Sequence, residues 1–417
     1  MSSFITELRP RRRAPSLGSA EARERWVHRR VGITWGLLFL NTLTFSSGTW
    51  NSLPLIVPIP TAIGKLLTQG ALPVALLLAL TVNRRIVIRP NVFLCLLSLL
   101  VVEAFVAGLH PAGHVIGTLY RTFRLAGFVA TLWLLTPWWG RRDMLLLRCH
   151  LRWLYVGLGS VLLGILIAPG HALAQNGRLS GAIWPMFPTQ IAQYAAVAAG
   201  LTVVLWLARL LSGRVTLAGV AVAVAILLLT HTRTALVGLV AGILVAGLSL
   251  FTINARVRKF FATGVIAVSI AVVTVAGVVS TWLARGENAQ GLTTLTGRTN
   301  FWNLVLNLPR TRFQEIFGFG MTNASINGLP IDSNWLASYL MEGLFGVVVC
   351  AMILAFLFVA AFFQPHGVQR ALALFLVTYC TVASYTEVSF TQASTYLLHL
   401  TVAASLLVMP LVGRRAA

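Results

Sequence analysis

The sequence has few charged residues and very few acidic ones. Only 10% of its 417 residues are charged, and ten are Asp or Glu against 32 Lys or Arg. No long polar stretch is available to form a separate soluble domain. Hydrophobic residues make up 57% of the chain, and the mean hydropathy is +0.83. The apolar residues form repeated runs of about twenty, the length a helix needs to cross a bilayer. Composition therefore predicts an all-α, polytopic membrane protein.

Metal, disulfide and nucleotide motifs are also missing. Cys95, Cys149, Cys350 and Cys380 are far apart in the sequence and contain no CxxC pair, so neither a disulfide framework nor a zinc site has support. No DxD or His/Asp cluster has metal-ligand spacing, and no P-loop or dinucleotide fingerprint is present. We therefore expect no metal and no cofactor, and any reaction must draw its energy from the substrate itself.

A nucleic-acid partner is not expected either, although the formal net charge is +22. The basic residues lie in short runs between apolar stretches, where they set membrane orientation. This bias predicts both termini in the cytoplasm, a basic cytoplasmic tail at 1–30 and a single transmembrane domain at 31–417. The predicted spans are 31–49, 67–83, 92–109, 115–136, 152–169, 187–208, 215–231, 234–252, 260–282, 333–362, 370–387 and 391–412.

One long polar connection, 283–332, is predicted on the extracytoplasmic side. It carries Trp302 and several phenylalanines, so disorder is the weaker interpretation. Residues 298–308 have an apolar face typical of a helix lying on a membrane surface. A loop of this length in an otherwise tight bundle is usually functional.

Arginines on the predicted outer side oppose the orientation bias and form the candidate site. Arg178 lies in an Asn-Gly-Arg-Leu-Ser-Gly segment, Arg233 in a threonine-rich turn, and Arg298 follows Gly297. Guanidinium groups bind phosphate oxygens in pairs. Three converging arginines could hold a diphosphate and stabilise it as a leaving group. The alternative for each arginine is an interaction with lipid headgroups or with a nearby acid.

Asp332 is the best candidate for a general base, because it is one of ten acids and lies beside the arginine-rich loop. Ser333 and Asn334 follow it and could orient it. The alternative is that Asp332 only caps the next helix. Glu342, ten residues later, is predicted to be structural or part of a cavity wall.

These segments resemble the O-antigen ligase/polymerase-like family of membrane glycosyltransferases. The resemblance covers about 175–346: residues 176–181 with Pro188, 230–236, Gly297-Arg298 with Trp302, 317–320, and 332–346. The ligase branch has a histidine where this chain has Asp332. This departure favours a polymerase.

The resemblance implies a GT-C-like bundle of about 12 helices in the bacterial cytoplasmic (inner) membrane. It implies an inverting, metal-independent transfer from an undecaprenyl-diphosphate-linked glycan, with a flippase and a chain-length regulator as further partners beside membrane lipids. The residues expected to take part in catalysis are Asp332, Arg298 and Arg233. The residues expected to bind the substrate are Arg178, Arg121, Arg124, Trp302, Ser333 and Asn334. A ligase and a lipid-linked sugar transporter remain the alternatives.

Overall fold

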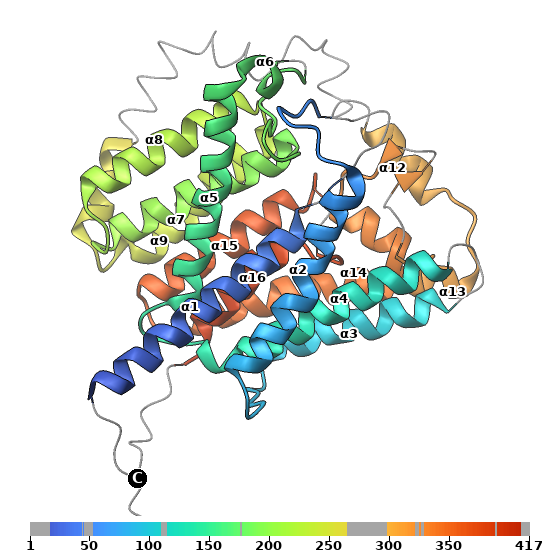
Figure 1. Ribbon diagram of the computed structural model, residues 1–417, viewed down its shortest axis with the longest axis horizontal. Coiled ribbons are helices and arrows are strands. Elements are labelled where there is room, and N and C mark those ends of the chain that lie inside the picture. Colours follow the sequence, from blue (N-terminus) through green and yellow to red (C-terminus); the bar gives the residue numbers. More distant parts are fainter. Residues whose placement is uncertain are drawn as a thin grey trace, which may run out of the picture.

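The described part of the structure is predominantly helical. A computed structural model describes residues 17–43, 45, 53–109, 115–175, 177–264, 298–321, 325–326, 329–387 and 390–409, with the backbone alone at 17–20, 298–301, 325–326 and 329–330. Within these ranges the helices are joined by turns and irregular connections, and the two strands form one antiparallel pair, β1 (Ser325–Ile326) and β2 (Leu329–Pro330). The all-α prediction is confirmed (Figure 1).

Eleven longer helices and several short ones follow one another along the described chain. The longer helices are α1 (Leu17–Thr42), α2 (Thr61–Val82), α3 (Val92–Gly108), α4 (Val115–Leu135), α5 (Leu145–Ile167), α7 (Pro188–Leu207), α8 (Gly213–Leu229), α9 (Arg233–Phe251), α14 (Asn334–Phe363), α15 (Val368–Ala383) and α16 (Thr395–Leu407). The short ones are η1 (Thr136–Trp138), α6 (Pro169–Ala172), α12 (Arg298–Leu306) and α13 (Arg312–Phe317).

Five of these helices are long and apolar enough to cross a membrane: α2, α5, α7, α9 and α14. Four more, α3, α8, α15 and α16, are apolar but shorter. The chain therefore has several helices that fit a bilayer by length and composition, as its hydropathy predicts.

Most helices begin and end close to the predicted ranges, and α1 is the main exception. α7 begins at Pro188 and α14 at Asn334, each one residue from its predicted start. α1 begins at Leu17 and ends at Thr42, so residues 17–30 of the predicted tail are helical. Hydropathy does not predict these first helical turns of α1, because many of their residues are charged. Of the predicted span 260–282, residues 260–264 are helical and the rest lie outside the described residues.

The core lies where α15 packs against α9 and α7. Gly200 on α7 and Gly242 on α9 face Phe375 on α15, and a Cβ at Gly242 would lie 2.7 Å from the Phe375 ring. Small residues at such crossings let helices approach closely. α7 and α16 are buried along nearly their whole length. In Figure 1, α16 lies near the middle of the molecule and α7 lies beside α8 and α9.

A buried polar chain joins four of these helices. The Trp35 indole nitrogen on α1 donates to Nδ1 of His150 on α5 at 3.2 Å. His150 Nε2 lies 2.7 Å from His399 Nδ1 on α16, and the Gln193 amide on α7 lies 3.0 Å from His399 Nε2. All four side chains are almost completely buried, and their mutual hydrogen bonds offset the cost of burying them.

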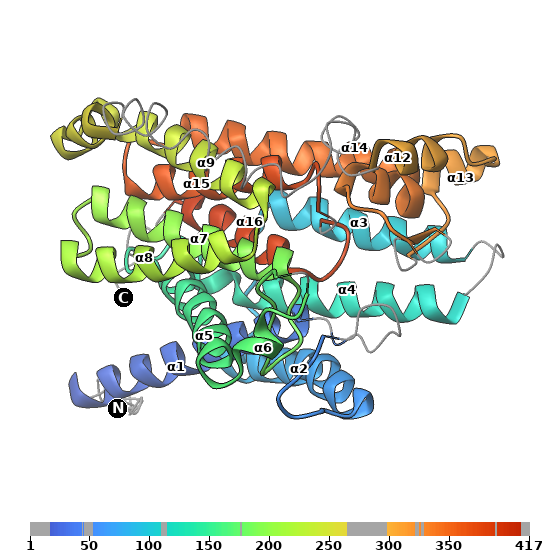
Figure 2. The same cartoon turned by 90° about the horizontal axis from the view of Figure 1, so that it is seen from above.

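The bundle has two ends. At the Arg178 end, α1, α3, α5, α8 and α15 finish and α2, α4, α7, α9, α14 and α16 begin. Hydrogen bonds tie this end together, including Thr42 to Thr395 at 2.9 Å and the Leu179 N–H to the Leu229 carbonyl at 3.0 Å. The opposite, Arg141 end carries the ion pairs of Arg141 and Arg148 with Asp143. Figure 2 shows α12 and α13 together at one extremity of the molecule.

Candidate functional site

Arg178 contacts the turn between α8 and α9, and Arg233 directly follows this turn as the first residue of α9. Arg178 follows Gly177, whose φ of +71° is a conformation that favours glycine, in the connection between α6 and α7. Its Nε donates to the Thr230 carbonyl at 3.0 Å, and a terminal nitrogen donates to the Thr232 hydroxyl at 3.3 Å. Two of the three predicted arginines therefore lie on segments that are in direct contact.

Arg233 is the first residue of α9 and is half-buried. Thr232 precedes it at the N-cap position, and its side chain makes no capping bond to α9. The N-terminus of a 19-residue helix adds a partial positive charge to that of the guanidinium. This end of α9 is therefore a favourable place for an anion.

The connection between α15 and α16 links Arg233 to the Asp332 segment. The Thr386 hydroxyl donates to the Thr234 hydroxyl at 2.7 Å, one residue after Arg233. Two residues before Thr386, the Ser384 carbonyl accepts from the Asn334 N–H at 2.9 Å. This connection was not among the predicted site segments, although its run of hydroxyl residues between two apolar stretches distinguishes it in the sequence.

Asp332 is half-buried and precedes α14, but it does not hold the capping position. The N-cap is Ser333, which is buried and whose side chain makes no capping bond. Asn334 is completely buried, and its side-chain oxygen accepts from the Phe390 N–H at 2.8 Å. Asn334 therefore holds the α15–α16 connection through both its backbone and its side chain, and its predicted contact with substrate stays a prediction.

Arg298 and Trp302 lie on α12, which packs beside the Asp332 segment. Val305 of α12 is fully buried in a small cluster with Ile331, Leu340 and Met341. Trp302 is half-buried, and within the described residues its indole nitrogen has no hydrogen-bond partner. The Arg298 side chain lies outside what the structure describes, so its predicted approach to Arg178 and Arg233 stays a prediction.

Arg121 and Arg124 on α4 contact protein groups. Arg124 Nε donates to the Asn41 side-chain oxygen at 3.3 Å, and a terminal nitrogen donates to the Asn41 carbonyl. Arg121 donates to the Met321 carbonyl at 3.3 Å. Arg124 therefore fastens α4 to the end of α1, and Arg121 fastens it to the chain after α13. Their predicted contacts with substrate stay predictions.

The helix α14 is interrupted at Gly343, a break that was not predicted from the sequence. Gly343 has φ +63° and ψ −161°, outside the helical region. In a continuous helix the carbonyls of residues 339–341 would accept from residues 343–345. Here Arg310 donates to the Tyr339 carbonyl, and the N–H groups of Phe319 and Gly320 donate to the Leu340 and Met341 carbonyls, all at 2.9 Å.

Arg310 therefore stabilises the break by donating to a carbonyl that has lost its helical donor. Its guanidinium also lies over the Tyr339 ring, 3.9 Å from the ring centre, and donates to the Val305 carbonyl at 3.1 Å. Burial lowers the pKa of Arg310 from its usual value. The signal available in the sequence was a glycine-rich segment, 317–320, followed by Gly343 within an apolar run.

Two carboxyl groups are buried next to the break. Glu342 is 0% and Glu103, on α3, is 2% exposed. In the described part of the chain none of their four oxygens has a hydrogen-bond partner. The two groups are close enough to interact electrostatically. Carboxyl groups in such surroundings are costly and are usually retained for a function.

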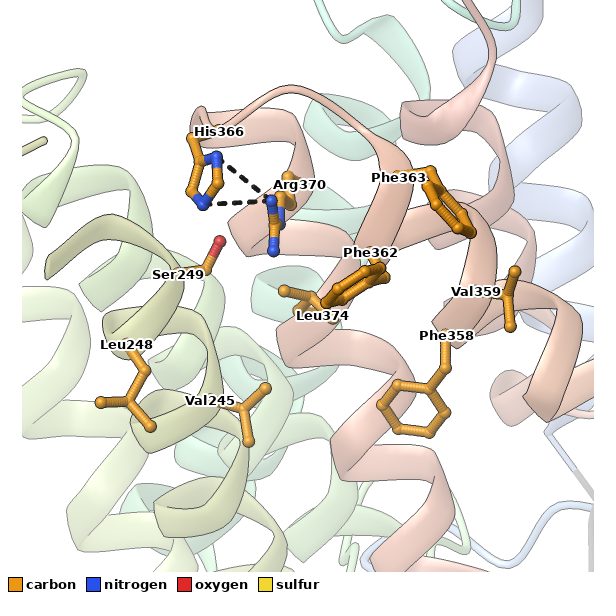
Figure 3. A pocket seen from close by; sticks show the side chains of 10 residues that line it. All are labelled: Val245, Leu248, Ser249, Phe358, Val359, Phe362, Phe363, His366, Arg370 and Leu374. Carbon is orange, nitrogen blue, oxygen red and sulfur yellow. Dashed lines mark hydrogen bonds between the residues drawn. The ribbon is translucent and has the colours of Figure 1, made fainter. Parts of the chain in front are cut away.

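A cavity of about 530 Å³ lies at the Arg141 end, between α9, α14 and α15 (Figure 3). Phe358, Phe362 and Leu374 form part of its wall, and Arg370 and His366 form its polar edge. It includes none of the predicted site residues. Among the residues that the structure describes, no three His, Cys, Asp or Glu side chains gather as metal ligands would.

The structure thus brings Arg178, Arg233 and Asp332 to one end of the bundle through the α15–α16 connection. No protein-family model matches this chain, and no curated protein matches it.

Proposed function

We propose that the protein is a membrane glycosyltransferase that polymerises a cell-surface polysaccharide from undecaprenyl-diphosphate-linked repeat units. The observation that carries the proposal is the contact of the Arg178 guanidinium with Thr230 and Thr232, directly before Arg233. It joins two cationic segments from distant parts of the sequence at the N-terminus of α9. Two guanidinium groups beside a helix N-terminus favour a ligand with two negative charges, such as a diphosphate.

In the proposed reaction Asp332 takes the proton of the acceptor hydroxyl. The hydroxyl oxygen then forms a bond to the anomeric carbon of the donor, and the bond from that carbon to the diphosphate oxygen breaks. The electron pair leaves with undecaprenyl diphosphate, whose charge Arg178, Arg233 and Arg298 stabilise. Attack opposite the leaving group inverts the anomeric centre.

The proposed setting is the bacterial cytoplasmic membrane, with a GT-C-like bundle of about 12 spans. Both termini and the Arg141 end face the cytoplasm, and the Arg178 end with the connection 283–332 faces outward. The support is the distribution of basic residues: Arg84, Arg85, Arg141 and Arg209 lie in connections between helices at the Arg141 end, and Arg256 follows the end of α9 there.

Binding of undecaprenyl diphosphate to the purified protein in lipid nanodiscs tests the proposal. Loss of one charge-assisted contact removes about 1.5–3 kcal/mol, so Arg178→Ala and Arg233→Ala should each weaken binding by roughly 10- to 100-fold. Arg214→Ala, which removes an exposed arginine at the other end, is the matched control. Undiminished binding by both site variants would refute the diphosphate site.

Arg178→Ala also removes the tether to the α8–α9 turn. The variant Thr232→Val removes one hydrogen bond of the tether but keeps the Arg178 charge, so it separates the loss of the tether from the loss of the charge. With lipid-linked repeat units, a polymerase lengthens the carrier-linked glycan, whereas a ligase moves the glycan to another anchor.

A transporter is the second candidate, because of Glu103, Glu342 and the broken helix α14. Discontinuous helices and intramembrane carboxyl groups are common at transport sites. Movement of the lipid-linked glycan across vesicle membranes without glycosidic bond formation, abolished in Glu342→Gln, would favour transport over polymerisation.

A further inference from the structure

A second cavity, of about 320 Å³, lies at the Arg141 end between the first turns of α5 and the middle of α1. Arg29 and His28 line it from α1, and Arg148 and Arg152 line it from α5. Arg148 and Arg152 are one turn apart on α5, and Arg29 lies on α1 at the same cavity, so both helices present arginines to this space. We call it the α1–α5 pocket.

The floor of the α1–α5 pocket is apolar and closely packed. The Trp153 indole donates to the Gly32 carbonyl at 3.0 Å, and a Cβ at Gly32 would lie 3.5 Å from Cys149 Sγ. Ile33, 41% exposed, lies on α1 one turn from Arg29. The pocket therefore combines cationic groups with apolar surface.

Acidic side chains neutralise only part of this charge. Asp143 pairs with Arg148 at 2.7 Å and with Arg141 at 3.1 Å. Asp143 and Glu24 also face His28, at 3.7 and 3.6 Å. Arg29 and Arg152 are exposed, and within the described residues neither has an acidic partner. Two guanidinium groups therefore stay available to an anion.

We propose that the α1–α5 pocket binds the headgroup of an anionic phospholipid. A phosphodiester placed between Arg29 and Arg152 accepts forked hydrogen bonds, and an acyl chain covers Ile33 beside them. Basic pockets between membrane helices bind anionic headgroups in this way. The residues of the chain outside the described ranges at either end, 1–16 and 410–417, are themselves arginine-rich, so their charge opposes their occupying the pocket.

The cavity of Figure 3 provides a contrast at the same end of the bundle. Its one arginine, Arg370, already donates to the Gln364 carbonyl at 3.3 Å and contacts His366. The α1–α5 pocket has three arginines on its lining. An anionic lipid therefore gains more from the α1–α5 pocket.

The test measures phosphatidylglycerol and phosphatidylcholine binding to the full-length protein in detergent, by native mass spectrometry. The wild type should prefer phosphatidylglycerol. Each arginine near an anionic surface contributes about fivefold in affinity, so Arg29→Ala/Arg152→Ala should lower phosphatidylglycerol binding by roughly 25-fold. Both side chains are exposed, and circular dichroism checks that the variant is folded.

Arg84→Ala/Arg85→Ala is the matched control, because it removes two exposed arginines from the connection between α2 and α3 at the same end. It should bind as the wild type does. Equal affinity for both lipids, or an equal loss in the control, would overturn the proposal. Inorganic phosphate that displaces phosphatidylglycerol at millimolar concentration would also overturn it, because the site would then be one for a soluble anion.

Discussion

Replacing Gly343 by alanine tests whether the break in α14 is built into the fold. The glycine has φ +63° and ψ −161°, a region that residues with a Cβ rarely adopt. An added Cβ would overlap the Ile316 carbonyl and lie 2.6 Å from the Phe317 nitrogen. Both contacts are with backbone atoms at the end of α13, which cannot rotate away as a side chain can.

The expected loss of stability has two parts. Holding alanine in this backbone conformation costs about 1–3 kcal/mol. Relieving the overlap with α13 costs a further 1–3 kcal/mol, as for other overpacked sites, so that the total is about 2–6 kcal/mol. Typical native proteins have only about 5–15 kcal/mol of net stability. Gly343→Ala should therefore unfold far more easily than the wild type.

Denaturation in mixed detergent micelles, followed by circular dichroism, measures this loss. Gly159→Ala on α5 is the control, because a Cβ there meets nothing within 4 Å and the helix should gain about 0.5–1 kcal/mol. Equal stability of Gly343→Ala and the wild type would refute the reasoning. The helix would then be able to run straight, and the contacts of Arg310, Phe319 and Gly320 would not be needed.

Three further outcomes are expected. Arg310→Ala should destabilise the protein by about 1–3 kcal/mol, since it leaves the Tyr339 carbonyl without its donor, whereas Arg312→Ala, at an exposed position, should change little in the same denaturation assay. Asn334→Ala should cost about 1–3 kcal/mol, because the buried Phe390 N–H loses its acceptor; faster proteolysis of the α15–α16 connection would report it, and unchanged proteolysis would count against this contact. Glu342→Gln should leave thermal stability the same or higher, because the carboxyl oxygens have no partner to lose among the described residues; a clear loss would show that this carboxyl has a structural contact.

The helices could be predicted from the sequence because an apolar run of sufficient length has few alternatives in a bilayer. Pro188 gave a sharp start for α7, since proline is tolerated in the first turn of a helix. The first fourteen residues of α1 could not be found in this way. They are rich in Arg and Glu, and hydropathy does not detect a helix that continues beyond its apolar part.

The site was predictable only in part. Arg178 and Arg233 stood out because they oppose the orientation bias, and the structure joins their segments. Arg310 also lies on the predicted outer side, yet it donates to the Tyr339 carbonyl, which lacks a helical donor because α14 is broken at Gly343. Glycine is common in membrane helices, so one glycine in an apolar run does not indicate a break.

The buried chain from Trp35 to Gln193 has a fixed polarity. An indole can only donate, so His150 Nδ1 must be an acceptor and its hydrogen must sit on Nε2. That hydrogen points to His399 Nδ1, which places the second imidazole hydrogen on Nε2. The Gln193 amide nitrogen faces this Nε2 at 3.0 Å, so the amide must turn its oxygen to this position to accept the hydrogen. One aromatic residue on α1 thus dictates the tautomers of two histidines and the orientation of an amide on three other helices. With phenylalanine in place of Trp35, His150 and His399 could adopt their other tautomers and the Gln193 amide could take its other orientation.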